Sequence, residues 1–158
     1  MTNTTQPHAS HATASKPISG LNKSILKPGF QELSIVPETL ASLAQFLHCY
    51  NRYLPSNWDE LFRLHSGRMR VAKDTFLKVM VVLSPATEVY SNWLTGQAMQ
   101  VCKRGEKAMY TIMNSLGNKF EPGAITTAKL MDAQEILKDL AGEVNVVLAK
   151  AKEAGLVD

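Results

Sequence analysis

Apolar residues near the C-terminus of this chain alternate three- and four-residue steps without a break. They are Leu130, Ala133, Leu137, Leu140, Val144, Val147, Ala151 and Ala154. These are the a and d positions of a heptad repeat, and they place one apolar stripe along one side of an α-helix. An isolated helix of this length is marginal in water, and burial of its apolar face supplies its stability. The pattern therefore predicts a long helix that pairs with another helix, either in the same chain or in a second copy. We call this stripe the C-terminal seam.

The chain upstream of the seam is also expected to be helical, because its apolar residues recur at steps of three and four. Prolines and glycines mark the expected helix ends. We predict helices over residues 37–54, 56–67, 68–83, 84–116 (with a break at Gly96 as an alternative) and 126–155. The run Val79–Leu83 is rich in β-branched residues, so a strand there is the alternative to a helix. The predicted fold is all-α, a small bundle of five or six helices.

The N-terminal residues have a different composition. Residues 1–29 are rich in Thr, Ser, Asn, Ala, His and Pro and show no sustained apolar periodicity. Such a segment buries too little surface to offset the entropy of ordering. We predict a disordered polar arm over residues 1–29 and a single helical domain over residues 30–158. Apolar residues return over 25–36, which is typical of an extended strap lying on the domain.

Charge is distributed unevenly along the chain. Residues 63–107 carry eight basic and three acidic side chains, whereas residues 121–158 carry four basic and seven acidic ones. The basic segment could attract a polyanion, pair with the acidic C-terminal segment, or form a solvated helix face. Two capped helices that meet at Ser66-Gly67 also loosely resemble a helix-turn-helix. The candidate phosphate contacts are Arg68, Arg70, Lys73, Lys103, Arg104 and Lys107.

No arrangement of residues points to catalysis. The sequence contains neither G-x-S-x-G nor H-E-x-x-H. His65 has acidic neighbours, but they lie five and six residues away on another helix face, and we expect this histidine at a helix C-terminus. The acidic row Asp132, Glu135, Asp139 and Glu143 flanks the seam and is interpreted as a solvated or ion-pairing face. We predict no catalytic residue, no metal site and no cofactor.

The sequence also bears on compartment and redox chemistry. The N-terminus lacks the apolar region of a secretory signal, and the longest apolar run, Val79–Leu83, is far too short to cross a bilayer. We expect a soluble protein, cytoplasmic by default, with export by a specialised secretion system through the polar arm as an alternative. Cys49 and Cys102 are far apart and are expected to be buried small hydrophobic residues.

These features favour a non-enzymatic helical interaction or assembly protein. Its expected partner is a second copy of itself or another helical protein. The alternative is a nucleic-acid-binding adaptor that uses residues 63–107. The sequence leaves open whether the C-terminal seam is covered within one chain.

Overall fold

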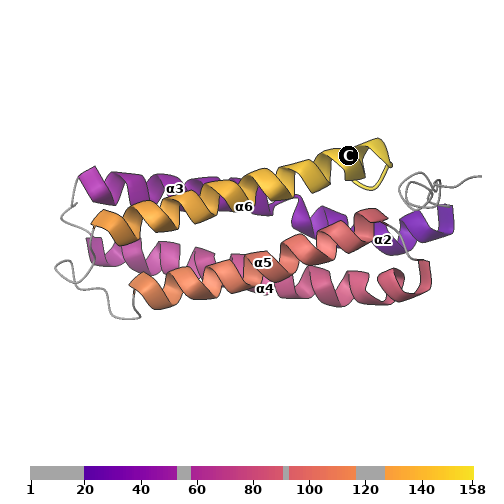
Figure 1. Cartoon of the computed structure of the whole chain (residues 1–158), viewed down its shortest axis with the longest axis horizontal. Helices are drawn as coiled ribbons and strands as arrows, with labels where there is room; N and C mark the ends of the chain where they lie inside the picture. Colours follow the sequence, from indigo (N-terminus) through magenta and orange to yellow (C-terminus); the bar gives the residue numbers. More distant parts are fainter. Residues whose placement is uncertain (1–19, 53–57, 91–92, 117–126) are drawn as a thin grey trace, which may run out of the picture.

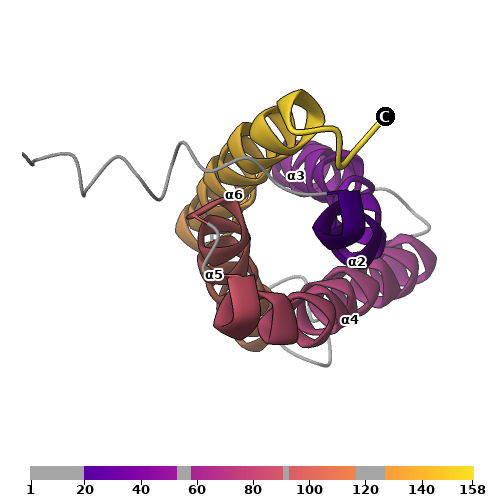
Figure 2. The same cartoon turned by 90° about the vertical axis from the view of Figure 1, so that its right-hand side faces the viewer.

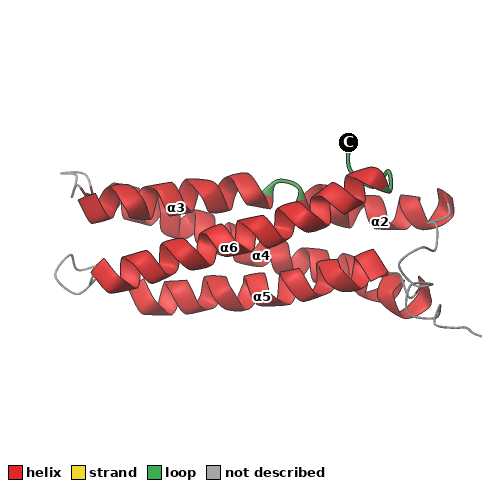
Figure 3. Ribbon diagram, turned by 45° about the horizontal axis from the view of Figure 1, so that its top comes forward, coloured by secondary structure: helices red, strands yellow, loops and turns green. Residues whose placement is uncertain are grey.

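The computed structural model describes residues 20–52, 58–90, 93–116 and 127–158. These residues contain helices and no strand (Figures 1 and 3), so Val79–Leu83 is helical and the all-α prediction is confirmed. The helices are α2 (Gly20–Leu33), α3 (Val36–Arg52), α4 (Trp58–Tyr90), α5 (Trp93–Leu116) and α6 (Thr127–Glu153).

The helices form a bundle of four columns. Helices α2 and α3 follow one another along a single column, and α4, α5 and α6 form one column each (Figures 1 and 2). Around the bundle the order is α2–α3, α4, α5 and α6, and neighbouring columns run in opposite directions. The bundle therefore has four packed columns rather than the predicted five or six separate helices.

Two predicted helix ends are absent, which explains the smaller number of columns. Helix α4 continues through Gly67 and through Ser84-Pro85, so the helix-turn-helix outline at Ser66-Gly67 is wrong. Glycine and proline weaken a helix by about 1 and 3 kcal/mol, respectively. Burial of Met69, Phe76 and Leu83 along one side of α4 offsets these costs.

The predicted boundary between arm and domain at residue 29 is also wrong. Residues 20–29 belong to α2, whose side chains Leu26, Phe30 and Leu33 are buried at four- and three-residue steps. Lys78 of α4 pairs with Glu32 of α2, with 2.7 Å between Nζ and Oε1. The segment predicted as an extended strap is therefore a helix in the core. Residues 1–19 lie outside the described residues, so disorder of the arm and export through it remain predictions for that part.

The junction between α2 and α3 follows from Pro37. Proline has no N–H to donate to the carbonyl of Leu33, and its ring crowds that carbonyl. Helix α2 accordingly ends at Leu33, where the amide of Ser34 donates to the carbonyl of Phe30 at 3.0 Å. The next helix begins at Val36, as the prediction of a helix start near Pro37 implied.

The long C-terminal helix is confirmed, and its seam is covered within the chain. The seven seam residues from Leu130 to Ala151 are at most 3% exposed, and they face the interior of the bundle, where α6 packs mainly on α3 and on α5. The helix ends at Glu153 and is capped by Gly155, as predicted, where φ is +77°. The amides of Gly155 and Leu156 donate to the carbonyls of Lys152 and Ala151, which is the Schellman arrangement.

Two glycines let columns approach closely. A Cβ atom on Gly105 of α5 would lie 2.5 Å from Cζ of Phe76 on α4, and one on Gly29 of α2 would lie 2.8 Å from Cδ2 of Leu83. Both distances are shorter than any tolerable carbon–carbon contact. A Cβ at either position would therefore force the facing side chain to move, and the two glycines bring α4 close to α5 and α2. None of the described helices is long and apolar enough to span a membrane.

Candidate interaction surfaces

The candidate phosphate contacts do not gather on one face. Arg68, Arg70 and Lys73 lie on α4, and Lys103, Arg104 and Lys107 lie on α5. Arg68 turns toward α3 and donates from Nη1 to Ser42 Oγ at 3.1 Å. Arg104 turns toward α6 and pairs with Glu143, to which its Nε donates at 2.8 Å. Because α3 and α6 flank opposite edges of the α4–α5 pair, these two arginines point away from each other.

The Arg104–Glu143 pair joins the basic and acidic segments that the charge distribution singled out. It supports the interpretation of Glu143 as an ion-pairing residue, whereas Asp132, Glu135 and Asp139 are exposed. Both partners are about half exposed, so the pair contributes at most about 1 kcal/mol. The pair therefore contributes more to the relative position of α5 and α6 than to the free energy of unfolding.

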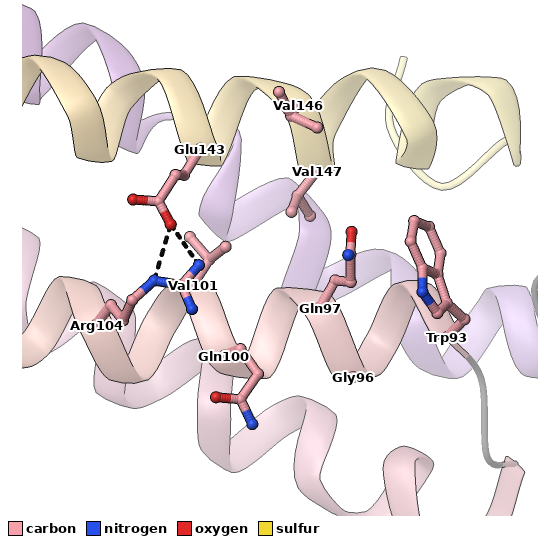
Figure 4. Close-up of a pocket in the computed structure, with 9 residues that line it drawn as sticks. All are labelled: Trp93, Gly96, Gln97, Gln100, Val101, Arg104, Glu143, Val146 and Val147. Atoms are coloured by element: carbon pink, nitrogen blue, oxygen red, sulfur yellow. Dashed lines mark hydrogen bonds and ion pairs between the residues drawn. The ribbon is translucent and has the colours of Figure 1, made fainter.

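A groove of about 640 Å³ lies between α5 and α6 (Figure 4). Val101 and Val147 are its buried apolar floor, and Gln97 and Trp93 project from α5 toward α6. Lys150 Nζ lies 3.9 Å from the centroid of the Trp93 ring, in a cation–π contact. The lining offers amides, apolar surface and an arginine that is already paired. We call it the α5/α6 groove.

A second groove, of about 840 Å³, lies between α3 and α4 on the opposite side of the bundle. Ile35, Leu64 and Val71 line it and are each more than half exposed. Gly67 lies among them, and a Cβ on Gly67 would meet no atom of the described residues within 4 Å. We call this hollow the α3/α4 groove.

Helix α4 exposes several aliphatic side chains to solvent. Its exposed aliphatic residues are Leu64 (52% exposed), Val71 (62%), Leu77 (39%) and Val81 (73%). Single exposed apolar residues are ordinary, but several along the same helix point to an interaction surface. The sequence contains the signal, since Leu64 and Val71 are seven residues apart. It was overlooked because residues 56–83 were divided into two helices at Gly67.

His65 is in the interior of α4, not at a helix C-terminus as predicted, because the helix continues past Gly67. The ring is buried and stacks on Phe46 of α3, with centroids 4.0 Å apart and planes at 17°. Its Nδ1 atom has no hydrogen-bond partner among the described residues. Burial, with a smaller contribution from the nearby Arg68 charge, lowers the pKa of His65.

Acid is therefore expected to destabilise the bundle through His65. The unfolded chain binds this proton at its ordinary pKa of about 6.5, whereas the folded chain binds it only at lower pH. The free energy of unfolding should fall as the pH drops below about 6.5, until the lowered pKa is reached. His65→Phe keeps the stack on Phe46 and cannot ionise, so urea unfolding between about pH 7 and 5 should depend less on pH in this variant. Equal pH dependence in the two proteins would assign the effect to other groups.

The two cysteines differ in environment. Cys102 is buried, as predicted, and burial raises the pKa of its thiol to about 12. Cys49 is exposed, which contradicts the prediction, and its Sγ accepts a hydrogen bond from Gln45 Nε2 at 3.4 Å. In the described part of the chain no group of three or more His, Cys, Asp or Glu side chains is arranged to hold a metal ion.

Comparison with known proteins adds no further information. No protein-family model matches the chain, and neither a curated protein nor a solved structure is significantly similar to it.

Proposed function

We propose that this protein is a non-enzymatic helical interaction protein that self-associates through the outward side of α4. The observation that carries the proposal is a set of four exposed aliphatic residues on α4: Leu77 and Val81 lie opposite the core, and Leu64 and Val71 border the adjoining α3/α4 groove. Full burial of a side chain of this size contributes about 1.5–3 kcal/mol. A second copy that covers these side chains would therefore gain a substantial part of the free energy that a dimer needs.

The C-terminal seam does not serve as the interface in this proposal. Its residues are already buried against α3 and α5, so a second copy could reach them only if the bundle opened. Among the described residues nothing competes for the outward side of α4, because α4 packs on α5, α2 and α3 with its other sides. Self-association is therefore assigned to α4 rather than to α6.

A nucleic-acid-binding adaptor is the second candidate. It is supported by Lys103 and Lys107, which are exposed one turn apart on α5. The opposite orientations of Arg68 and Arg104 count against a single phosphate-binding face. The two candidates differ in what they predict for the isolated protein.

The test is the mass of the wild-type chain in solution, measured by light scattering over a range of concentrations. Self-association predicts the mass of two chains at high concentration, at both low and high salt, with or without a DNA duplex. The mass of one chain at every concentration would overturn the proposal. The adaptor would be favoured by a single chain that binds the duplex only at low salt. The logarithm of its binding constant should then fall with the logarithm of the salt concentration, with a slope of about −0.9 per phosphate contact.

A further inference from the structure

We infer that two copies pair through antiparallel α4 helices, related by a dyad at the level of Ala72, so that Arg70 of each copy lies opposite Asp74 of the other. The inference rests on the proposed self-association and specifies its geometry. Its occupant is a second copy of this chain.

The pairing surface is a stripe on the side of α4 opposite its core. The core stripe of α4 consists of residues 65, 69, 72, 76, 79 and 83, all buried. Each residue that precedes a core-stripe residue by two positions lies about 200° from it around the helix axis. These residues form what we call the outer stripe, which consists of Arg63, Gly67, Arg70, Asp74, Leu77 and Val81. This stripe also alternates four- and three-residue steps, and all its members except the half-buried Gly67 are exposed. A single bundle thus presents to solvent, opposite the core of α4, a stripe that combines the apolar Leu77 and Val81 with charged side chains of both signs.

The outer stripe is complementary to itself when two copies run antiparallel. A dyad at the level of Ala72 places Arg70 opposite the partner's Asp74, and Asp74 opposite the partner's Arg70. It also places Arg63 opposite the partner's Val81, where the apolar stem of arginine can cover the valine. No two like charges of the stripe face each other. Such a two-fold arrangement, in which each contact occurs twice, is what an isologous interface requires.

Shape complementarity follows the same register. The dyad places Leu77, the largest apolar residue of the outer stripe, opposite the partner's Gly67. Gly67 lies in the α3/α4 groove, where no atom of the described residues would meet its Cβ within 4 Å. The exposed Leu64 and Val71 border this hollow. Leu77 of each copy would therefore fill an apolar hollow of the other, as a knob fills a hole.

A parallel pair lacks both kinds of complementarity. In register, it would place Arg63 against Arg63, Arg70 against Arg70 and Asp74 against Asp74. Like charges that face each other weaken association. It would also set Gly67 against Gly67, which leaves the hollow empty. The outer stripe therefore favours the antiparallel pair.

Charge reversal tests the central contact. R70D puts a carboxylate opposite the partner's Asp74, and D74R puts two guanidinium groups opposite each other, so each single variant should raise the dimer dissociation constant by roughly tenfold. The double variant R70D/D74R restores opposite charges and should return to nearly the wild-type constant. A wild-type dimer that neither single variant weakens would overturn this geometry and leave self-association intact. A wild-type chain that is monomeric throughout would instead overturn the proposed function.

A matched pair of glycine variants tests the hollow. Gly67→Gln fills the α3/α4 groove and should weaken the dimer by roughly tenfold or more, because the partner's Leu77 then has no space. Gly96→Gln makes the same change in the α5/α6 groove, where a Cβ also meets no atom of the described residues within 4 Å. This control should leave the dimer unchanged. Equal effects of the two variants would contradict the inference.

Cross-linking measures the direction of pairing. With 1.5 Å of rise per residue, the dyad separates the two copies of residue 71 by about 3 Å along the helix axis and the two copies of residue 81 by about 27 Å. In a Cys49→Ser background, which removes the exposed native thiol, a short bis-maleimide should cross-link Val71→Cys between copies and should not cross-link Val81→Cys. Efficient cross-linking of Val81→Cys alone would indicate a parallel pair and overturn the inference.

Discussion

Removal of residues 128–158 is expected to unfold the protein rather than to leave a folded monomer. The deletion takes away Leu130, Leu137, Leu140, Val144 and Val147, all nearly fully buried. At about 1.5–3 kcal/mol for each buried aliphatic side chain, this loss is comparable to the total stability of a domain, about 5–15 kcal/mol. It also uncovers the apolar side of α3. Circular dichroism should therefore show the loss of most helical signal and of a cooperative unfolding transition.

Two point variants on α6 provide the matched control for this deletion. Leu137 is fully buried, whereas Met131 is 58% exposed on the same helix. Leu137→Ala should lower the free energy of unfolding by about 2–5 kcal/mol, and Met131→Ala should change it by less than about 0.5 kcal/mol. If the truncated chain stays folded and cooperative, the seam is not part of the single-chain core, and the account of α6 is wrong.

Gly105→Ala is expected to destabilise the protein although alanine is the better helix former. The added Cβ would lie 2.5 Å from Cζ of Phe76, whose ring is fully buried between α4 and α5. Overpacking of this kind costs about 1–3 kcal/mol, and here it must also cancel a gain in helix propensity of about 1 kcal/mol. Urea unfolding should show a lower midpoint, and the free energy of unfolding should depend on the urea concentration with a similar slope.

Gly142→Ala is the control, and Phe76→Leu is the rescue. Gly142 is an exposed glycine in α6 whose Cβ would meet no atom of the described residues within 4 Å, so Gly142→Ala should stabilise the protein by about 0.5–1 kcal/mol. Phe76→Leu shortens the side chain that faces Gly105. The double variant Gly105→Ala/Phe76→Leu should lower the free energy of unfolding by less than the sum of the two single changes, as expected for residues in contact. Strict additivity would show that Phe76 is not the residue that excludes a Cβ at Gly105.

The elements that the sequence predicted best are those fixed by local chemistry or by burial on one face. The C-terminal seam was predictable because every one of its positions from Leu130 to Ala151 is buried in a regular helix. Local chemistry made two helix boundaries predictable. Gly155 adopts the positive φ that caps α6, and Pro37 has the fixed φ that suits the first turn of α3.

The errors arose where tertiary burial outweighed a local signal. Gly67 and Pro85 weaken α4, but a core stripe that includes Phe76 carries the helix through both positions. Leu26 contributes to a buried face of α2, although the polar composition of residues 1–29 suggested a disordered segment. In both cases the deciding contacts come from other columns, which the sequence alone does not place.

The interaction surfaces were the least predictable feature. Helix α4 carries apolar residues both in the core and on its exposed surface, and only the fold distinguishes the two. For the basic residues, proximity in the sequence did not predict proximity in the fold. Arg68 and Arg104 belong to the same charged stretch of sequence, but α3 and α6 draw them to opposite sides of the bundle.

We propose that copies meet on the outward side of α4 while the C-terminal seam is closed within one chain. Sedimentation equilibrium of the wild type beside the double variant V71Q/V81Q tests it most directly, because both valines are more than half exposed and their replacement should barely change stability. We predict the mass of two chains for the wild type and of one chain for the variant, with the same unfolding midpoint at a protein concentration at which both are monomeric. A variant that retains the mass of two chains would contradict the claim.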